Sequence, residues 1–513
     1  MRFFSLFAPS LLEQKKSLRL MVEQLEDRTQ MSVTVGVSVD GMNTTNNSCN
    51  CQPPDTIAAA GPNHIVELVN TAIEVFDKAG NVTSAPQSLI SFFTNHIKAN
   101  ESDPFVFYDE LAGKFVAGIL DFGSTNSSNF VDFATGVDSL SGITWTLHSP
   151  YASGEGRKFL DYPRVGYNAD AYFIEGNMFR GGRFSNVQVI TIDKSTLNVV
   201  SRHDDSTLFT LTPAAMHGSS TGGPEYFVEA ANGGASTLQV VTETNVLSST
   251  PTFATSSVAV TPYSGGGAPP GGVASFDDRI FDAAFRNVSG VNHLVTAHQV
   301  AGGSVPVVGR WYDINTSTMS LIQSGNAPTG VSGASTFMPS VDINTAGSIG
   351  MNFNESASNE FWSMYVTERI ASDPSGTMEA PVRVATGIST TPDSRVGDFS
   401  STVVDPSDGL TFWGAGEYQG SDFWDTHIAS FKSSTGAAAV IAVITPTTSS
   451  YPAPNLQAAL AHDPTNTDMA PINQTAGPQA ATDTGSAVSG SATAGLDDFF
   501  ADPRNWDFPT VRF

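Results

Sequence analysis

Aspartates recur at long intervals along the central part of the 513-residue sequence, each close to the start of an expected β-strand. They are Asp55, Asp103, Asp161, Asp278 and Asp398, and the polar residues His217, Arg279 and Arg395 stand near comparable positions. If these strand starts meet around one axis, the carboxylates repel one another unless a cation or a basic ligand lies among them. The pattern therefore predicts a ligand-binding cluster, with calcium as the candidate cofactor and Asp55, Asp103 and Asp161 as its candidate metal ligands.

The same aspartates have a structural interpretation, and the sequence leaves it open. An aspartate at the start of a strand accepts hydrogen bonds from backbone N–H groups, and the pair Asp-Pro is a common turn opening. Under this interpretation the carboxylates cap turns and bind no ligand.

A pair of carboxyl groups also suggests glycoside hydrolysis, which requires two of them with one held protonated. Glu417, in "WGAGEYQG", is the candidate acid and Asp398 its partner, because both fall in the last repeat of the chain. A sialidase would further need three arginines and a tyrosine nucleophile, a set that could be assembled from Arg164, Arg279, Arg395 and Tyr162. The chain has no P-loop, Rossmann glycine fingerprint, His-Glu-x-x-His or Gly-x-Ser-x-Gly motif, so catalysis is not favoured.

The elements that must position these residues are strands. Between residues 31 and 440 apolar and polar residues alternate in short runs, separated by Gly, Asn, Asp and Ser, and helical spacing is nearly absent. Three segments share a pattern of Pro, any residue, Val, any residue, Tyr or Ile, then Asp or Asn, a turn and a second apolar strand. They are anchored at Pro104, Pro163 and Pro339.

Weaker copies of the repeat begin near Asp55, Pro213, Asp278 and Asp398. The starts lie roughly 48 to 64 residues apart, and each unit has room for four strands, which is typical of propeller blades. The sequence therefore predicts an all-β fold, a single β-propeller of seven four-stranded blades over residues 31–440. Two sandwiches joined by the Gly- and Pro-rich stretch at 261–276 remain the alternative.

A propeller must close its ring, commonly with a strand from one end of the chain. The valines at alternate positions of 33–39 are the expected closing strand, and "AAAVIAVIT" at 437–445 is the competitor. Val33, Val35, Val37 and Val39 would share one face of that strand.

Composition narrows the classes of partner. Asp and Glu number 50 against 24 Lys and Arg, and a net charge of −26 argues against nucleic acid. No run of 18 apolar residues predicts a transmembrane span. The only cysteines, Cys49 and Cys51, could supply at most two of the four ligands of a structural zinc.

The two ends of the chain differ from its centre. Residues 1–30 hold five Lys and Arg against four Asp and Glu and read as an export leader. Residues 441–495 are rich in Pro, Ala, Thr and Ser and are expected to be a disordered linker. Residues 496–513 bring back aromatic side chains that could dock onto the domain or onto a partner.

Two resemblances accompany these patterns. The stretch "VEQLEDRTQMSV" resembles the Leu-Glu-x-Leu-Glu-x-Arg leader of exported planctomycete-type proteins, with Val22 in the first Leu position. The words "PPDTIAAAGPNHIVELVN", "DPFVFYDELAGKFV", "DYPRVGYNADAYFI" and "RVGDFSSTVVDPSDGLTFWGAGEY" resemble a family of bacterial exported propellers of the sialidase-like or seven-bladed type. The resemblance implies a signal-bearing protein outside the bacterial cell or in its envelope, and it implies no settled activity or cofactor.

These observations favour an exported or cell-surface propeller, acting as a monomer, that binds a glycan, an envelope component or a protein partner without catalysis. The alternative is a sialidase-like glycan-active hydrolase or lyase that uses carboxylates at the mouth of the channel. A third hypothesis makes the propeller a structural spacer that docks through its aromatic C-terminus.

Overall fold

A computed structural model describes residues 33–46, 53–94, 100–122, 129–153, 158–271, 278–389, 397–420 and 424–433. The regular elements in this part of the chain are strands β1 to β30 and one short helix, α1 (Leu89–Phe92). The predicted leader, the predicted disordered linker, the aromatic C-terminal segment and both cysteines lie outside the described residues. Within the described ranges, no helix combines the length and hydropathy that a bilayer crossing requires.

The strands form antiparallel sheets in which chain neighbours pair. In three sheets of four strands the spatial order follows the chain. The first contains β2 (Ile57–Ala60), β3 (His64–Val69), β4 (Ala72–Asp77) and β5 (Val82–Ser88), and the second contains β15 (Thr212–Pro213), β17 (Glu225–Ala230), β18 (Gly234–Thr244) and β19 (Thr252–Ser264). The third contains β24 (Ser335–Ile343), β25 (Ile349–Ala357), β26 (Glu360–Arg369) and β27 (Val382–Ala385). A five-stranded sheet contains β6 (Asn100–Asp109), β7 (Lys114–Phe122), β8 (Asn129–Ser139), β9 (Gly142–Leu147) and β10 (Tyr151–Ala152).

Two further sets of four strands share one sheet. They are β11 (Phe159–Tyr167), β12 (Ala171–Arg180), β13 (Arg183–Asp193) and β14 (Val199–Asp205), and then β20 (Ile280–Val288), β21 (Val291–Ala301), β22 (Val307–Asn315) and β23 (Ser320–Asn326). The short strand β16 (Ala215–His217) joins them by pairing parallel to both β11 and β20. Because of this shared sheet, a count of seven separate blades stays a prediction.

The remaining sheet is built from both ends of the described chain. Its order is β1 (Val33–Asn43), β30 (Asp425–Ser433), β29 (Phe412–Tyr418) and β28 (Ser401–Val404). Strand β1 runs antiparallel to β30, with Val33 opposite Ser433 and Val39 opposite Ile428. The predicted closing strand at 33–39 is thus confirmed, and the competitor at 437–445 lies outside the described residues.

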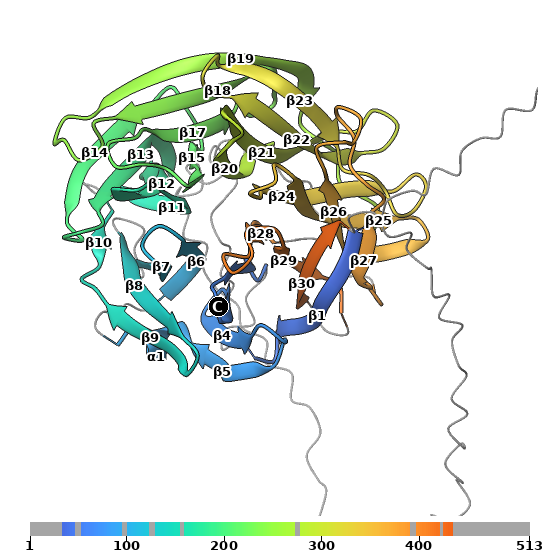
Figure 1. The fold of residues 1–513 in the computed structure, drawn as a ribbon, viewed down its shortest axis with the longest axis horizontal. Helices are drawn as coiled ribbons and strands as arrows, with labels where there is room; N and C mark the ends of the chain where they lie inside the picture. Colours follow the sequence, from blue (N-terminus) through green and yellow to red (C-terminus); the bar gives the residue numbers. More distant parts are fainter. Residues whose placement is uncertain are drawn as a thin grey trace, which may run out of the picture.

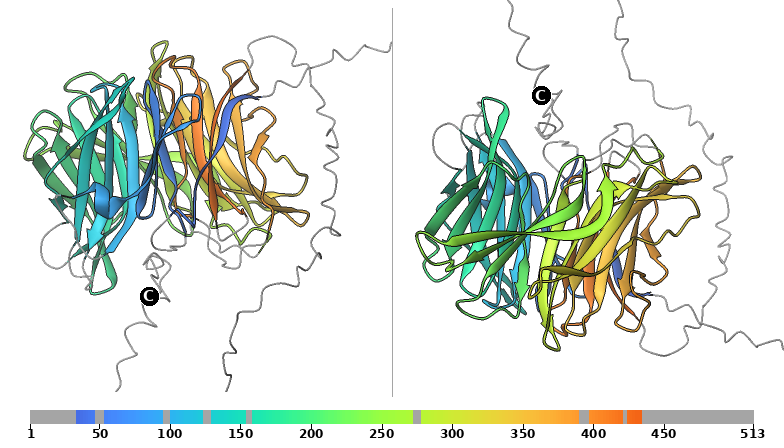
Figure 2. Two further views of the ribbon diagram at one scale, coloured as in Figure 1. Left: turned by 90° about the horizontal axis from the view of Figure 1, so that it is seen from below. Right: turned by 90° about the horizontal axis from the view of Figure 1, so that it is seen from above.

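The first strands of successive sets form a closed ring. Strands β2, β6, β11, β15, β20, β24 and β28 each contact the next, and β28 contacts β2. Figure 1 looks down on this ring, and the two side views in Figure 2 show the sheets standing side by side around it. The fold is an all-β propeller, as the repeat predicted.

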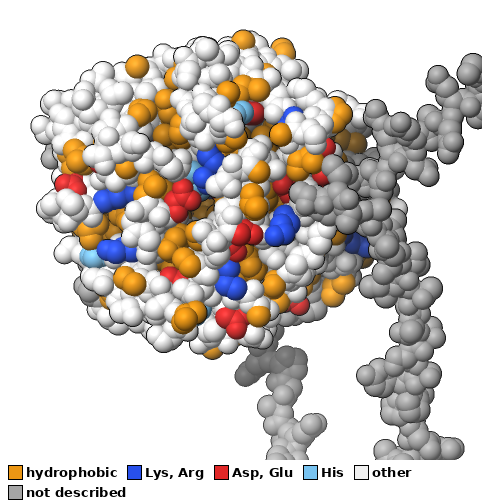
Figure 3. All heavy atoms as spheres, in the orientation of Figure 1, with side chains coloured by type: hydrophobic (Ala, Val, Ile, Leu, Met, Phe, Trp, Pro, Cys, Tyr) orange, Lys and Arg blue, Asp and Glu red, His pale blue; other side chains and the backbone are white. Residues whose placement is uncertain are grey.

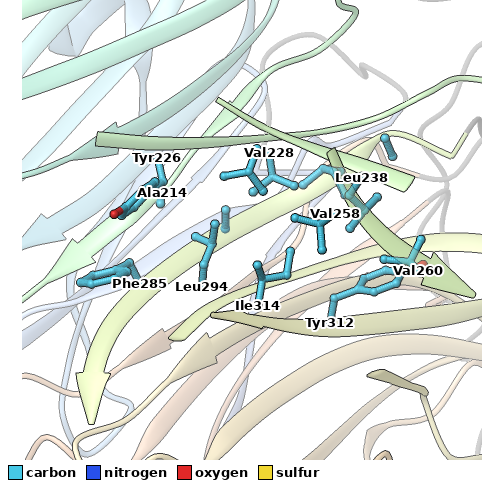
Figure 4. Close-up of a cluster of buried hydrophobic side chains, with 14 of the residues drawn as sticks. Ala214, Tyr226, Val228, Leu238, Val258, Val260, Phe285, Leu294, Tyr312 and Ile314 are labelled. Atoms are coloured by element: carbon cyan, nitrogen blue, oxygen red, sulfur yellow. The ribbon is translucent and has the colours of Figure 1, made fainter. Parts of the chain in front are cut away.

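Packing between neighbouring sheets explains which strands are buried. In Figure 4, side chains from β17, β18 and β19 interleave with side chains from β20, β21 and β22, for example Val228 and Leu238 with Leu294 and Ile314. Each fully buried side chain of this size contributes roughly 1.5 to 3 kcal/mol to folding. Since both faces of a sheet are covered in this way, all nine residues of β24 and of β25 are buried.

The repeat prolines lie at bulges near the starts of the innermost strands. Asp103, Tyr162 and Met338 have positive φ angles of 56°, 56° and 50°, and each precedes one of the anchors Pro104, Pro163 and Pro339. Strand pairing shifts register there, between Ser102 and Phe105 for example. Strands β6 and β24 are edges of their sheets, and β11 pairs with β16 only at Tyr167, away from Pro163. A bulge on such an unpaired side is where proline, which has no N–H, is tolerated.

Candidate functional site

The ends of the innermost strands place polar side chains at two mouths of the central channel. We call the end where these strands begin the start mouth and the end where they finish the far mouth. Figure 3 shows one face of the ring, with basic and acidic side chains gathered around its centre.

At the start mouth, two arginines pack against one tyrosine ring. The guanidinium carbon of Arg164 lies 4.2 Å from the centroid of the Tyr162 ring, and that of Arg279 lies 3.9 Å from it. Arg164 is also 4.4 Å from the centroid of Phe399. All three polar side chains are buried, which strengthens cation–π attraction because water does not compete for the charge.

Hydrogen bonds attach this stack to the sheet across the channel. The Tyr162 hydroxyl donates to the carbonyl oxygen of Asp398 at 3.1 Å, and Nη2 of Arg164 donates to the same oxygen at 3.4 Å. Nη2 of Arg164 also contacts the Tyr162 hydroxyl. Side chains of β11 therefore hold the segment that leads into β28.

Three of the predicted aspartates do come together here, as part of a hydrogen-bonded chain. Asp55 accepts from the backbone N–H of Asp398 at 3.3 Å and from the side-chain amide of Asn70 at 2.6 Å. Asn70 accepts from the N–H of Asp103 at 2.9 Å, and Asp103 accepts from the N–H of Tyr162 at 3.1 Å. These contacts are of the capping kind that the structural interpretation describes.

The other predicted acidic residues are buried at the same end of the strands. Asp161 directly precedes Tyr162 in β11, and Asp278 accepts from the N–H of Gly233 at 3.0 Å. Glu417, in β29, accepts from the N–H of Gly397 at 2.6 Å, so its carboxylate contacts the residue next to Asp398.

Metal binding at this mouth stays a prediction. Among the residues that the structure describes, no three His, Cys, Asp or Glu side chains form a group that could hold a metal ion. Arg395 lies outside the described residues, so its place in the predicted cluster and in the predicted arginine triad is not defined.

A cavity of about 110 Å³ continues from the start mouth along the axis. Of the lining residues that the structure describes, most are apolar, and the charged or titratable ones are Arg164, Asp282 and Asp342. Asp282 accepts from the N–H of Val341 at 2.9 Å and from the hydroxyl of Ser340. Burial raises the pKa of Asp282 to about 8, against the opposing effects of these hydrogen bonds and of the Arg164 charge, so its carboxyl is mostly protonated at neutral pH.

The far mouth holds a different cluster, centred on His217. The imidazole Nε2 lies 3.0 Å from a carboxylate oxygen of Asp342, and Nδ1 lies 3.3 Å from a carboxylate oxygen of Glu110. Arg286 is 3.7 Å from the other oxygen of Glu110, and the Tyr167 hydroxyl is 3.5 Å from Nδ1 of His217. The five residues come from four innermost strands or their ends and from β16.

Electrostatics fix the charge states of this far cluster. Burial alone would lower the pKa of His217, but the charges and hydrogen bonds of Asp342 and Glu110 outweigh it and raise the pKa to about 9. Burial likewise opposes ionisation of Glu110, yet His217 and Arg286 lower its pKa to about 2. At neutral pH the imidazole is therefore a cation between two carboxylates.

The sequence grouped His217 with the aspartates, and the structure corrects this. His217 ends β16 and lies at the far mouth, because that short strand places its last residue beside the ends of β11 and β20. Sequence reasoning missed Glu110, Asp282 and Asp342. For Asp342 the sequence did contain a signal. Arg164 lies one place after Pro163 and Asp342 lies three places after Pro339, and residues at both of these repeat positions line the cavity.

No protein-family model and no curated protein matches the chain. Solved structures that resemble it include a Penicillium chrysogenum α-L-arabinanase complexed with arabinobiose, at 10% identity and a TM-score of 0.38, covering 78% of this chain and 98% of that one. A Trypanosoma rangeli sialidase gives 10% identity, a TM-score of 0.35 and coverage of 76% and 59%. A Fusarium graminearum α-L-arabinofuranosidase gives 10% identity, a TM-score of 0.37 and coverage of 79% and 98%. With 10% sequence identity and TM-scores of 0.35 to 0.38, these structural similarities support no statement about function.

Proposed function

We propose that the protein is an exported propeller that binds an acidic substituent of a glycan or other envelope polymer at the start mouth, without catalysis. The substituent reaches the axial cavity, where Arg164 meets its carboxylate. The rest of the polymer lies across the face of the ring.

The observation that carries this proposal is the charge state of the cavity lining. Arg164 is a permanent cation, and Asp282 is mostly neutral at pH 7 because burial raises its pKa to about 8. The third group, Asp342, faces the cationic His217 at 3.0 Å. In a chain of net charge −26, this cavity is therefore a local site that favours an anion.

The size of the cavity limits what enters it. A water molecule requires about 10 to 15 Å³ of such a cavity. A volume of about 110 Å³ thus holds a few small groups, such as a carboxylate and the atoms that bear it, and not a chain of sugar rings. Binding of one substituent in a preformed hole suits recognition of a polymer along its length.

The test compares an acidic polymer fragment with its neutral counterpart. In calorimetric titrations of the full chain we expect oligogalacturonate to bind and its methyl ester to bind at least tenfold more weakly. Arg164→Gln should abolish the preference, whereas Arg383→Gln, on the outer strand β27, should leave it unchanged. Equal affinity for the acid and the ester would reject the proposal.

The pH dependence gives a second test of the same site. Ionisation of Asp282 adds a negative charge beside the ligand, so affinity for oligogalacturonate should fall as the pH rises through about 8. Asp282→Asn keeps a neutral side chain of the same shape and should bind equally well at pH 6.5 and pH 9. A fall in the affinity of Asp282→Asn equal to that of the wild type would show that another group is responsible.

One observation favours a second function, a sialidase-like hydrolase. Tyr162 lies against Arg164 and Arg279, which are three members of the set assembled from the sequence. A fluorogenic sialoside is the appropriate substrate, and Tyr162→Phe should abolish its turnover. Activity that survives Tyr162→Phe but is lost in Asp398→Asn and Glu417→Gln would point to the carboxylate pair instead.

A further inference from the structure

A groove lies at the outer rim of the ring, far along the sheets from the channel. It separates the outer strands β5 and β9 of two neighbouring sheets, next to α1, and these three elements lie close together at the rim in Figure 1. Its volume is about 330 Å³, which is within the range of small-molecule sites. Its lining residues are His64, Ile73, Val75, Thr83, Ser84, Gln87, Phe92, Leu140, Ser141, Gly142, Ile143 and Trp145.

Two aromatic rings form one wall of the groove. Phe92 and Trp145 meet edge to face, with ring centroids 5.2 Å apart, and both are partly exposed. Leu140, at the turn between β8 and β9, is 92% exposed beside them. Together these side chains give the groove an apolar wall that is in part open to solvent.

Polar side chains form the other part of the lining. Ser84 and Gln87 are exposed on β5. His64 is 5% exposed, and its Nδ1 lies 2.7 Å from a carboxylate oxygen of the buried Asp138, which fixes the orientation of the ring. With Nδ1 engaged in this way, Nε2 is the ring nitrogen that can bond to an occupant of the groove.

Among the lining residues that the structure describes, none is Asp, Glu, Lys or Arg. An occupant therefore gains little from charge and must supply hydroxyl groups for Gln87, Ser84 and His64 and an apolar face for Trp145. A neutral sugar ring has both features, with C–H groups on its faces and hydroxyls at its edge. A bare apolar ligand would leave the polar half of the lining without partners.

We propose that this groove binds a neutral oligosaccharide, with one sugar ring stacked on Trp145 and hydrogen-bonded to Gln87. The site is separate from the start mouth in position and opposite in its chemistry, since it takes an uncharged ligand. It does not depend on the function proposed for the axial cavity.

Calorimetric titration of the full chain with cellohexaose, xylohexaose, mannohexaose and chitohexaose tests the inference. At least one of them should bind, and Gln87→Leu should weaken that binding several-fold. Gln87 is exposed on an outer strand, so this variant should keep the wild-type thermal transition. Trp145→Ala should weaken binding at least tenfold.

Two controls separate the groove from other surfaces. Phe361→Ala removes an aromatic side chain that is 44% exposed on another sheet and should leave the affinity unchanged. Leu247→Ala shortens an apolar side chain that is 48% exposed between β18 and β19 and should also leave the affinity unchanged. The inference is overturned if none of the four sugars binds at millimolar concentration, or if binding persists in folded Trp145→Ala and Gln87→Leu.

Discussion

The two mouths of the channel hold their charges in different ways. At the start mouth, Arg164 and Arg279 lie on the ring of Tyr162, and Asp55 and Asp103 accept from backbone N–H groups. At the far mouth, His217 lies between the carboxylates of Glu110 and Asp342. One end of the channel therefore uses cations that never lose their charge, and the other uses a cation that titrates.

This difference predicts which mouth responds to pH. Guanidinium groups stay charged throughout the stable range of a protein, so the contacts between Arg164 and the aromatic rings persist from acid to alkaline pH. The far cluster holds together only while His217 is protonated and Glu110 is ionised. Both mouths connect separate sheets across the channel, so a substitution at either one tests how far the ring depends on it.

The largest effect is expected from Arg164→Ala at the start mouth. The variant loses contacts with the rings of Tyr162 and Phe399 and leaves the Asp398 carbonyl oxygen with fewer donors. Loss of a buried, stacked cation of this kind should cost about 3 kcal/mol of the free energy of unfolding, measured in urea. The loss should be larger at pH 9 than at pH 6, because the Arg164 charge also stabilises the ionised form of Asp282.

Arg383→Ala is the matched control for that measurement. Its side chain is 44% exposed and pairs with Glu360 at 3.1 Å on the outer part of a sheet. Because solvent screens the half-exposed Arg383 charge, its removal should change the free energy of unfolding by about 0.5 kcal/mol or less. Equal losses in the two arginine variants would mean that the start cluster has no special role in holding the ring.

The second largest effect is expected from His217→Gln at the far mouth. The variant removes the cation from between Glu110 and Asp342, which should cost about 2 kcal/mol at pH 6. Since the pKa of His217 is about 9 in the folded protein, above its ordinary value of 6.5, its stabilising effect is complete below pH 6.5 and is lost as the pH rises through 9. The difference between wild type and variant should therefore shrink between pH 6.5 and pH 10, and a constant difference would contradict the pairing.

The propeller could be predicted from the sequence because its repeat has a local cause. Pro104, Pro163 and Pro339 mark bulges near the starts of innermost strands, and a bulge leaves the same pattern wherever it occurs. The alternation of apolar and polar residues along a strand was a weaker guide to which strands are buried. It describes outer strands such as β9, whereas β24 and β25 are buried along their whole length because sheets cover both of their faces.

The contents of the two mouths could be predicted only in part. Asp55, Asp103 and Asp398 fall at equivalent places in their repeats, so the repeat indicated that they meet. The far cluster joins Glu110, His217 and Asp342 from separate sheets, and β16 has only three residues and no counterpart in the repeat. The position of Asp342 after Pro339 is a local signal, but nothing local in the sequence marks Glu110 and His217 as its partners, because ring closure alone brings them together.

A smaller effect, opposite in sign, is expected from Asp282→Asn in the axial cavity. With its pKa raised to about 8, Asp282 stabilises the fold most at acid pH, and this contribution is lost as the pH rises toward 8. An asparagine stays neutral, so the variant should be more stable than the wild type by about 1 kcal/mol at pH 9. The difference should be smaller at pH 5, which is closer to the ordinary pKa of 3.8 below which it vanishes, and urea titrations at the two pH values measure the change.

The smallest effect is expected from Glu110→Gln at the far mouth. The Glu110 side chain is 24% exposed, and a glutamine oxygen can still accept from the N–H of Gly218, which lies 3.0 Å from the carboxylate. At pH 7 the loss of stability should be about 0.5 kcal/mol, because solvent screens a partly exposed pair. With one carboxylate fewer, the pKa of His217 should also fall, so the alkaline loss of stability should begin at lower pH than in the wild type. A double-mutant cycle with His217→Gln measures this coupling directly, and a coupling energy of zero would show that Asp342 alone holds the imidazolium.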